Sequence, residues 1–239
     1  MSWKNKLIVA LDVSSADKAL AIVDMLSDYA YVFKVGFELY VNAGPSIVQR
    51  IHDKGKKVFL DLKFHDIPNT VSRAAASATR LGVYMFNLHT SGGMEMMVKC
   101  REAVEETCVK ESLTKPRIIG VTALTSLNNE IMKNELCVQH TVKTQVKHLA
   151  LLAQKAGLDG VVASPQEITL IKKHCGGKFL VVAPGIRPSW ALPDDQMRTA
   201  TPRDALRDGA DYIVMGRGIL AQEDPLKTLE LISLEILTA

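Results

Sequence analysis

Short apolar runs rich in Val, Ile and Phe recur along the whole chain, and this rhythm constrains the fold more than any other feature. Segments of helical character separate the runs. Strands that alternate with helices imply parallel pairing through βαβ crossovers, and continuously apolar strands are typical of a sheet covered by helices. We therefore predict an α/β fold, a (β/α)₈ TIM barrel forming a single domain over residues 1–239, with a doubly wound open sheet as the alternative. The eight predicted strands are LIVALD (7–12), YVFKVG (31–36), KVFLDLK (57–63), YMFNLH (84–89), RIIGVTAL (117–124), GVVAS (160–164), FLVVAPG (179–185) and YIVMG (212–216).

Helix boundaries have their own signals between these runs. Ser14-Ser15-Ala16-Asp17 resembles a capping box before an amphipathic stretch, and Thr201-Pro202-Arg203-Asp204 repeats that pattern with Pro at the first helical position. A glycine just after a helix favours a left-handed cap. Four glycines stand at such places, namely Gly55, Gly82, Gly157 and Gly209.

Composition excludes several classes of protein. A chain of 239 residues that is 47% hydrophobic can build one substantial core, and its net charge of +3, without any run of Lys or Arg, predicts no nucleic-acid partner. No apolar stretch reaches the length of a membrane span, and the apolar run at 7–11 ends at Asp12, which is not the pattern of a signal peptide. The cysteines form no C-x-x-C pair, so we expect reduced thiols, no zinc site and a cytoplasmic protein; they are Cys100, Cys108, Cys137 and Cys175.

Polar side chains gather where the predicted strands end. In a barrel of this kind, functional groups lie at the carboxyl ends of the strands. We expect no comparable polar set at the opposite strand ends. This asymmetry between the two ends predicts an active site at the carboxyl ends of the strands. The alternative is that strand ends lie near water and carry polar residues for that reason alone. The residues are Asp12, Lys34, Asp61, Lys63, His89, Thr122 and Thr125.

The stretch FLDLKFHDIPNT (59–70) carries the densest charge pattern. Strand side chains alternate, so Leu60 and Leu62 are expected to pack under the helices while Asp61 and Lys63 point into the barrel mouth. Asp66 lies past the strand, before a helix that begins near 67–68, and could reach back to the lysine or toward another subunit.

Lys34 arrives from the adjacent second strand, so two lysines and two aspartates share the site. Nearby carboxylates favour the charged form of an ammonium group. Such a lysine is a poor nucleophile, but it suits the stabilisation of a developing carbanion and the transfer of a proton to that carbon.

The last two strand ends predict a phosphate site. Barrel enzymes often bind phosphate with the loops after strands 7 and 8, and here these loops read Pro184-Gly185-Ile186-Arg187 and Gly216-Arg217-Gly218. Glycine lets backbone N–H groups approach an anion, and a short helix over 216–220 would add its N-terminus. The long segment 188–200 is a candidate lid with Gln196 as its polar finger. Alternatively, the glycines only serve turns and the arginines are solvated.

The residues at these positions resemble the orotidine 5′-monophosphate decarboxylase family, in its shorter, bacterial-type form. The run Asp61-Leu62-Lys63-Phe64-His65-Asp66-Ile67-Pro68-Asn69-Thr70 is similar to the signature D-x-K-x-x-D-I-x-N-T. The resemblance extends along nearly the whole chain. It includes Asp12 at the end of the first strand, Lys34 in F-K-V-G, Thr125 in L-T-S, Arg187 in P-G-I-R-P, and Gly216-Arg217 in M-G-R-G.

This resemblance implies a (β/α)₈ homodimer that converts orotidine 5′-monophosphate (OMP) to uridine 5′-monophosphate (UMP) and CO₂ in pyrimidine biosynthesis, without metal or organic cofactor. It implies that Lys63 protonates C6, that Asp61 faces the departing carboxylate, and that Lys34 belongs to the same network. The partner subunit would contribute Asp66, Ile67 and Thr70. The remaining implied contacts are Asp12 and Lys34 to the ribose, Thr125 to the pyrimidine, Pro184, Arg187, Gly216 and Arg217 at the phosphate, and Gln196 between phosphate and base.

Two other functions remain open at this point. One is a magnesium-dependent phosphosugar lyase or decarboxylase of the same superfamily, because Asp61 and Asp66 resemble hard-metal ligands. Those relatives usually carry an acidic residue where this chain has Lys34. The other is a non-catalytic nucleotide sensor, which needs the phosphate loops but no charged tetrad. We expect structural roles for His65 and for His89, with acid–base chemistry as the alternative for His89.

Overall fold

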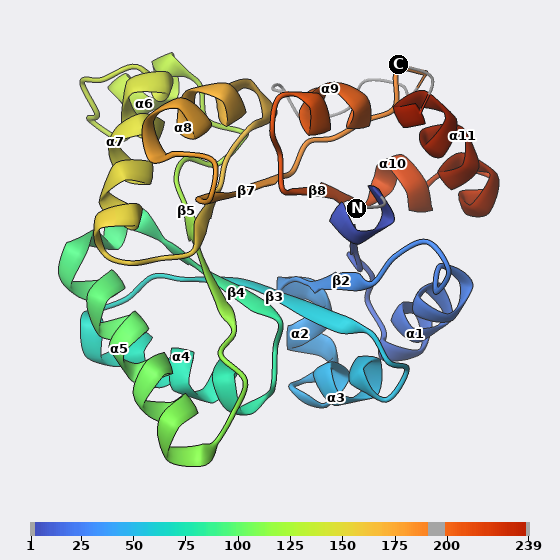
Figure 1. The fold of residues 1–239 in the computed structure, drawn as a ribbon, viewed down its shortest axis with the longest axis horizontal. Helices are drawn as coiled ribbons and strands as arrows, with labels where there is room; N and C mark the ends of the chain where they lie inside the picture. The colour runs from blue at the N-terminus through green and yellow to red at the C-terminus, as the bar shows by residue number, and fades with distance from the viewer. Residues whose placement is uncertain (1–2, 191–198, 238–239) are drawn as a thin grey trace.

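The computed structural model describes residues 3–190 and 199–237, and its centre is a closed barrel of eight parallel strands (Figure 1). Each strand pairs with the next along the chain, and β8 returns to pair with β1. All eight predicted strands are confirmed, and the open-sheet alternative is wrong. The strands are β1 (Leu7–Ala10), β2 (Val32–Val35), β3 (Lys57–Phe64), β4 (Met85–His89), β5 (Arg117–Val121), β6 (Gly160–Val162), β7 (Leu180–Ala183) and β8 (Tyr212–Met215).

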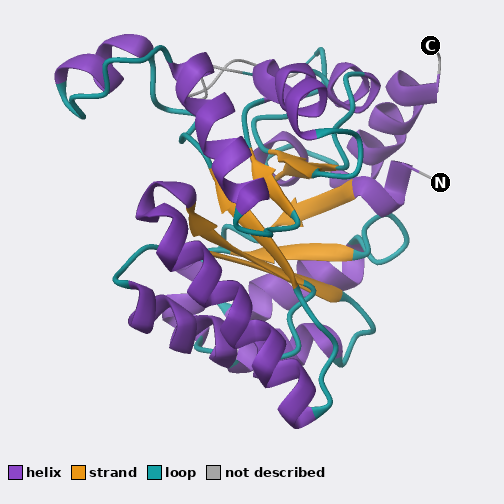
Figure 2. Ribbon diagram, turned by 60° about the vertical axis from the view of Figure 1, so that its left-hand side comes forward, coloured by secondary structure: helices purple, strands orange, loops and turns teal. Residues whose placement is uncertain are grey.

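Helices surround the strands on the outside, as Figure 2 shows. Within the described part of the chain, no helix is both long and apolar enough to cross a membrane. The α-helices are α1 (Ala16–Met25), α2 (Phe37–Ala43), α3 (Ser46–His52), α4 (Pro68–Arg80), α5 (Gly93–Glu111), α6 (Asn129–Asn134), α7 (Val142–Lys155), α8 (Ile168–Cys175), α9 (Pro202–Arg207), α10 (Arg217–Leu220) and α11 (Pro225–Leu237). Among the described residues, the 3₁₀ helices are η1 (Trp3–Lys6), η2 (Thr90–Gly92) and η3 (Pro165–Glu167).

The predicted helix boundaries are confirmed by their hydrogen bonds. Ser15 caps α1 by accepting a hydrogen bond from Lys18 N, and Thr201 caps α9 by accepting one from Asp204 N. The four glycines predicted to follow helices all have left-handed backbone conformations, with φ of 71° at Gly55, 69° at Gly82, 83° at Gly157 and 107° at Gly209. Because only glycine adopts such angles at no steric cost, these four positions end their helices.

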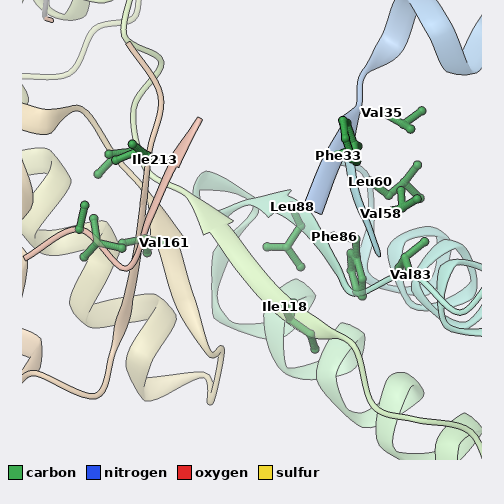
Figure 3. Packing of buried hydrophobic residues seen from close by; sticks show 14 of the residues in the cluster. Phe33, Val35, Val58, Leu60, Val83, Phe86, Leu88, Ile118, Val161 and Ile213 are labelled. Carbon is green, nitrogen blue, oxygen red and sulfur yellow. The ribbon is translucent and has the colours of Figure 1, made fainter. Parts of the chain in front are cut away.

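Alternation along each strand divides the core into two layers. One face packs against the helices: Figure 3 shows members of this layer, among them Phe33, Val58 and Leu60. The other face fills the barrel interior, where Phe59 and Val182 are buried. The inward-facing side chains of the strands are apolar in the barrel interior and polar toward the carboxyl ends. This change places the charged groups at one end of the barrel.

The opposite end of the barrel also carries polar side chains, so the prediction of no comparable polar set there is wrong. The Arg117 guanidinium donates hydrogen bonds to the hydroxyls of both Tyr84 and Tyr212, which lie 2.7 Å from each other. Lys57 Nζ lies 4.5 Å from the centre of the Tyr84 ring. Aromatic rings satisfy these cations at the amino ends of the strands. Polar groups are therefore present at both ends of the barrel.

Candidate active site

A cavity of about 250 Å³ opens among the loops at the carboxyl ends of the strands. Its floor is apolar and comes from the inward row of the strands, including Phe59, Val182 and Val214. Nine of the residues predicted for the site line it, which places them around one space. They are Asp12, Lys34, Asp61, Lys63, Thr125, Pro184, Arg187, Gly216 and Arg217.

Four of these side chains form a chain of alternating charges across three neighbouring strands. Lys34 Nζ lies 2.9 Å from Asp12 Oδ1 and 3.2 Å from Asp61 Oδ2. Lys63 Nζ lies 2.8 Å from Asp61 Oδ1. Each carboxylate oxygen of Asp61 therefore meets a different ammonium group. The sequence predicted that the two lysines would share this site with Asp61 and Asp66. The pairing of both lysines with Asp61 is confirmed, but the second carboxylate of the chain is Asp12 and not Asp66.

Burial and charge oppose each other at the centre of this chain. The side chains of Lys34 and Asp61 are each only 12% exposed. Burial disfavours the charged form of Lys34, but Asp61 and Asp12 together outweigh it, so its pKa is raised above the ordinary value. Burial likewise disfavours ionised Asp61, but Lys34, Lys63 and a hydrogen bond from Asn87 lower its pKa below the ordinary value. Both groups are thus charged at neutral pH.

Strand β3 presents Asp61 and Lys63 to the cavity by an irregular route. Leu60 and Leu62 pack on the helix side, as predicted. Leu60 pairs with Phe86 and Phe64 pairs with Leu88, so four steps on β3 match two on β4, and β3 bulges between them. Within this bulge Lys63 has a φ of 44°, a left-handed angle that non-glycine residues rarely adopt.

Another wall of the cavity is built by the loops after β7 and β8. Arg187 N donates to Ala200 O at 3.0 Å, and Ala200 N donates to Gly185 O at 3.3 Å, so the two ends of the loop after β7 are joined. Gly185 has a φ of 75°, which requires glycine. Gly216 precedes the short helix α10, as predicted, and a Cβ there would lie 3.2 Å from Ala10 Cβ. Two arginines and two glycines thus meet at one wall, a combination suited to an anion.

Comparison with known proteins agrees with the family resemblance of the sequence along nearly the whole chain. A family model described as "Orotidine 5'-phosphate decarboxylase / HUMPS family" matches residues 5–232. The chain belongs to this family.

Individual relatives agree with that assignment. The chain is 48% identical over 236 residues to orotidine 5′-phosphate decarboxylase of Moorella thermoacetica, covering 99% of this chain and 94% of that protein. The protein of the same name from Syntrophotalea carbinolica is also 48% identical, covering 99% and 96%. Among solved structures, orotidine 5′-phosphate decarboxylase from Lactobacillus acidophilus superposes with a TM-score of 0.84 at 34% identity, covering 98% of this chain and 99% of that one.

Three predicted site residues of this family member lie away from its own cavity. Asp66, Ile67 and Thr70 follow β3 at the start of α4 and are exposed. Asp66 Oδ1 accepts a hydrogen bond from Ile67 N at 2.6 Å, and among the described residues it forms no ion pair with Lys63. Gln196 lies outside the described residues.

The two histidines near the signature lie beside the charged chain. The rings of His65 and His89 are 5.2 Å apart. Burial, followed by the nearby His65 and Lys63, lowers the pKa of His89 below the ordinary value. This environment favours the neutral imidazole at neutral pH. His89 does not line the cavity, in keeping with the structural role expected for it.

The sequence did not reveal three residues that contact the charged chain. Asn87, inward-facing on β4, contacts Asp61 and Lys63. The Phe37 ring centre lies 5.4 Å from Lys63 Nζ. A Cβ at Gly36 would lie 3.0 Å from Lys34 Nζ, so a side chain there would crowd the ammonium group. Only Asn87 left a signal, because it is a polar residue between the apolar Phe86 and Leu88.

Proposed function

We propose that this protein is a carboxy-lyase that converts OMP to UMP and CO₂ in pyrimidine nucleotide biosynthesis, acts in the cytoplasm and needs no cofactor. Family membership and the names of the relatives support the overall reaction. The observation that carries the mechanism is the unbroken chain of charges at the cavity, in which successive groups are 2.9, 3.2 and 2.8 Å apart. A cytoplasmic location is consistent with four free cysteines.

The cavity wall suggests how the substrate is oriented. Phosphate binds between the loops after β7 and β8, where Arg187 and Arg217 supply charge and Pro184 and Gly216 shape the wall. Asp12 and Lys34 hold the ribose hydroxyls, and Thr125, in the loop after β5, contacts the pyrimidine. This orientation directs C6 and its carboxylate toward Asp61 and Lys63.

The chemical difficulty of the reaction is the electron pair left on C6. The bond between C6 and its carboxylate breaks, CO₂ leaves, and both bonding electrons stay on the carbon. The Lys63 ammonium stabilises this charge, and one of its N–H bonds then breaks to deliver a proton to C6, giving UMP. The resulting neutral amine takes a proton from water. A fixed ammonium in a site shielded from water is an effective electrostatic stabiliser.

Asp61 has two roles in this proposal. Its contact with Lys63, at 2.8 Å, holds the ammonium in place. It also faces the substrate carboxylate, and departure of CO₂ relieves the repulsion between them. Binding energy from the distant phosphate offsets the cost of bringing two anions together.

The charges favour this reaction over the magnesium-dependent alternative. A divalent cation would need the oxygens of Asp61, yet one oxygen accepts a hydrogen bond from Lys63 and the other lies against Lys34. Both positions that a metal would occupy are taken by ammonium groups of the chain itself.

We further propose a homodimer in which Asp66, Ile67 and Thr70 complete the partner's cavity. Ile67 is 66% exposed, and the α2 residues Phe37 and Val41 are 56% and 79% exposed. Such apolar exposure is typical of an interface. The position of Asp66 outside its own cavity supports a role across that interface.

A spectrophotometric assay with OMP, with and without EDTA, tests the proposal. We expect rapid formation of UMP that is insensitive to the chelator. Loss of activity in EDTA, restored by Mg²⁺, would instead favour the metal-dependent alternative. Tight UMP binding without turnover of OMP would favour a nucleotide sensor.

A further inference from the structure

We propose that Asn87 is a positioning residue that sets the relative placement of Asp61 and Lys63 for proton transfer. Asn87 Nδ2 donates a hydrogen bond to Asp61 Oδ1 at 2.7 Å, and Asn87 Oδ1 accepts one from Lys63 N at 2.7 Å. One rigid side chain thus holds the carboxylate and the backbone of the lysine at once. The inference rests on the proposed decarboxylation for its kinetic consequences, but not for its structural ones.

The backbone irregularity of β3 explains why such a residue is needed. Between Leu60 and Phe64, β3 bulges away from regular pairing with β4. The Lys63 N–H within this bulge is satisfied by the side chain of Asn87. This bond also fixes the left-handed φ of 44° at Lys63, a conformation that a residue with a Cβ keeps only when its surroundings impose it.

The side chain of Asn87 is itself held firmly. It is 1% exposed, on a strand whose flanking residues Phe86 and Leu88 are fully buried on the helix side. Its amide must present oxygen to the backbone N–H and nitrogen to the carboxylate, because the N–H can only donate and the carboxylate only accept. The neighbouring strand β5 places the apolar Ile119 opposite it. A buried group with both functions satisfied leaves little freedom to either partner.

This geometry makes asparagine chemically specific at the position. Asp61 Oδ1 accepts from both Asn87 Nδ2 and Lys63 Nζ, so the amide orients the carboxylate toward the ammonium without competing for its charge. An apolar residue would leave the Lys63 N–H unsatisfied. An ionised aspartate would accept from the N–H but repel Asp61, whereas a protonated aspartate could both donate and accept as the amide does.

Replacement of Asn87 tests the inference through kinetics. Asn87→Ala should lower kcat for OMP by about 10²-fold, the loss that a misplacement of about 1 Å can cause, while KM and the Kd of UMP change less than threefold. Asp159→Ala is the matched control, because Asp159 also accepts from a backbone N–H of the neighbouring strand, Ile118 N at 2.7 Å, but it immediately precedes β6 at the far end of the barrel. The control should lose stability and keep kcat within about twofold.

Asn87→Asp supplies a readout that a purely structural role would not change. The titratable groups that face this position are Asp61 and Lys63 from β3, with Lys34 behind Asp61 and His89 on the same strand. Burial and Asp61 favour the neutral acid there. The ratio of its kcat to that of the wild type should therefore rise at least tenfold as pH falls from 8 to 5, while the same ratio for Asn87→Ala stays flat.

A crystal structure of Asn87→Ala separates this inference from the proposed reaction. We expect Lys63 to leave its left-handed conformation or Nζ to move away from Asp61 Oδ1. The inference would be overturned if Lys63 of Asn87→Ala kept its conformation and its contact with Asp61, or if the kcat of this variant stayed within threefold of the wild type. It would also be overturned if the kcat ratios of Asn87→Asp and Asn87→Ala changed with pH in the same way. If the wild-type protein fails to turn over OMP, the proposed function fails, and the crystal structure alone then decides whether Asn87 positions Lys63.

Discussion

Replacement of Asp61 by asparagine should destabilise the fold as well as abolish the charge balance of the site. Asp61 lies 3.2 Å from Lys34 and 2.8 Å from Lys63. At an effective dielectric constant of about 20, these contacts correspond to gross attractions of about 5 and about 6 kcal/mol. The cost of desolvating the three groups offsets much of this gain. Breaking a buried pair by removing one partner costs about 3–5 kcal/mol, because the remaining charge stays buried.

The structure places this variant toward the lower end of that range. Lys34 keeps Asp12 at 2.9 Å in Asp61→Asn, and the side chain of Asp12 is more than half exposed. We therefore expect a loss of about 3 kcal/mol in the free energy of unfolding, or roughly 6–12 °C in Tm for a chain of this size. Urea denaturation followed by circular dichroism measures it. The matched control is Asp24→Asn, which breaks a 2.7 Å pair with Lys54 in a more exposed setting and should cost less than about 1 kcal/mol.

The dependence of this loss on pH identifies its cause. The pKa of Asp61 is lowered from 3.8, so its contribution to stability is present above pH 3.8 and is lost as pH falls through the folded-state pKa. The pKa of Lys34 is raised from 10.5, so its contribution is present below pH 10.5 and is lost as pH rises through the folded-state pKa. The difference between wild type and variant should be largest between these limits and shrink on both sides. A variant as stable as the wild type at pH 7 would refute this reasoning. A difference in the free energy of unfolding that does not change with pH would refute it as well.

Three further substitutions probe the rest of the site. Arg217→Ala should lower kcat/KM for OMP far more than for orotidine, which lacks the phosphate, and an equal effect on both substrates would contradict a phosphate role. Gly36→Ala places a Cβ 3.0 Å from Lys34 Nζ, so the ammonium must move by a few tenths of an ångström. Because of this shift, kcat/KM for OMP should fall about tenfold. The Tm should change little, since the backbone φ of −97° at this position suits alanine. Ile67→Glu should shift sedimentation toward the monomer and lower activity at low protein concentration, and a fully active monomer would contradict a site shared between subunits.

The sequence predicted the fold well because two local signals agree in it. Apolar runs with breaks at regular distances mark the eight strands, and glycines such as Gly55 and Gly209 mark helix ends by a conformation that other residues avoid. Period-two alternation then determines which side chains of a strand face inward. The alternation in 59–63 was sufficient to predict that Asp61 and Lys63 line the cavity.

Features that depend on neighbouring strands were not predictable in this way. The bulge in β3 arises from its register against β4, and nothing in the residues 60–64 themselves indicates a left-handed lysine. The role of Asn87 likewise follows from the residue it lies beside, not from its own run. The polar groups at the amino ends of the strands were missed for the same reason, since Arg117 and Tyr212 are 95 residues apart in sequence.

The kcat of Lys63→Ala with OMP tests the central claim most directly, because that claim assigns both charge stabilisation and proton transfer to this one ammonium. We expect kcat to fall by at least ~10⁴, about 5 kcal/mol of barrier, while the Kd of UMP changes by less than tenfold. A variant that retains turnover within tenfold of the wild type would contradict the account.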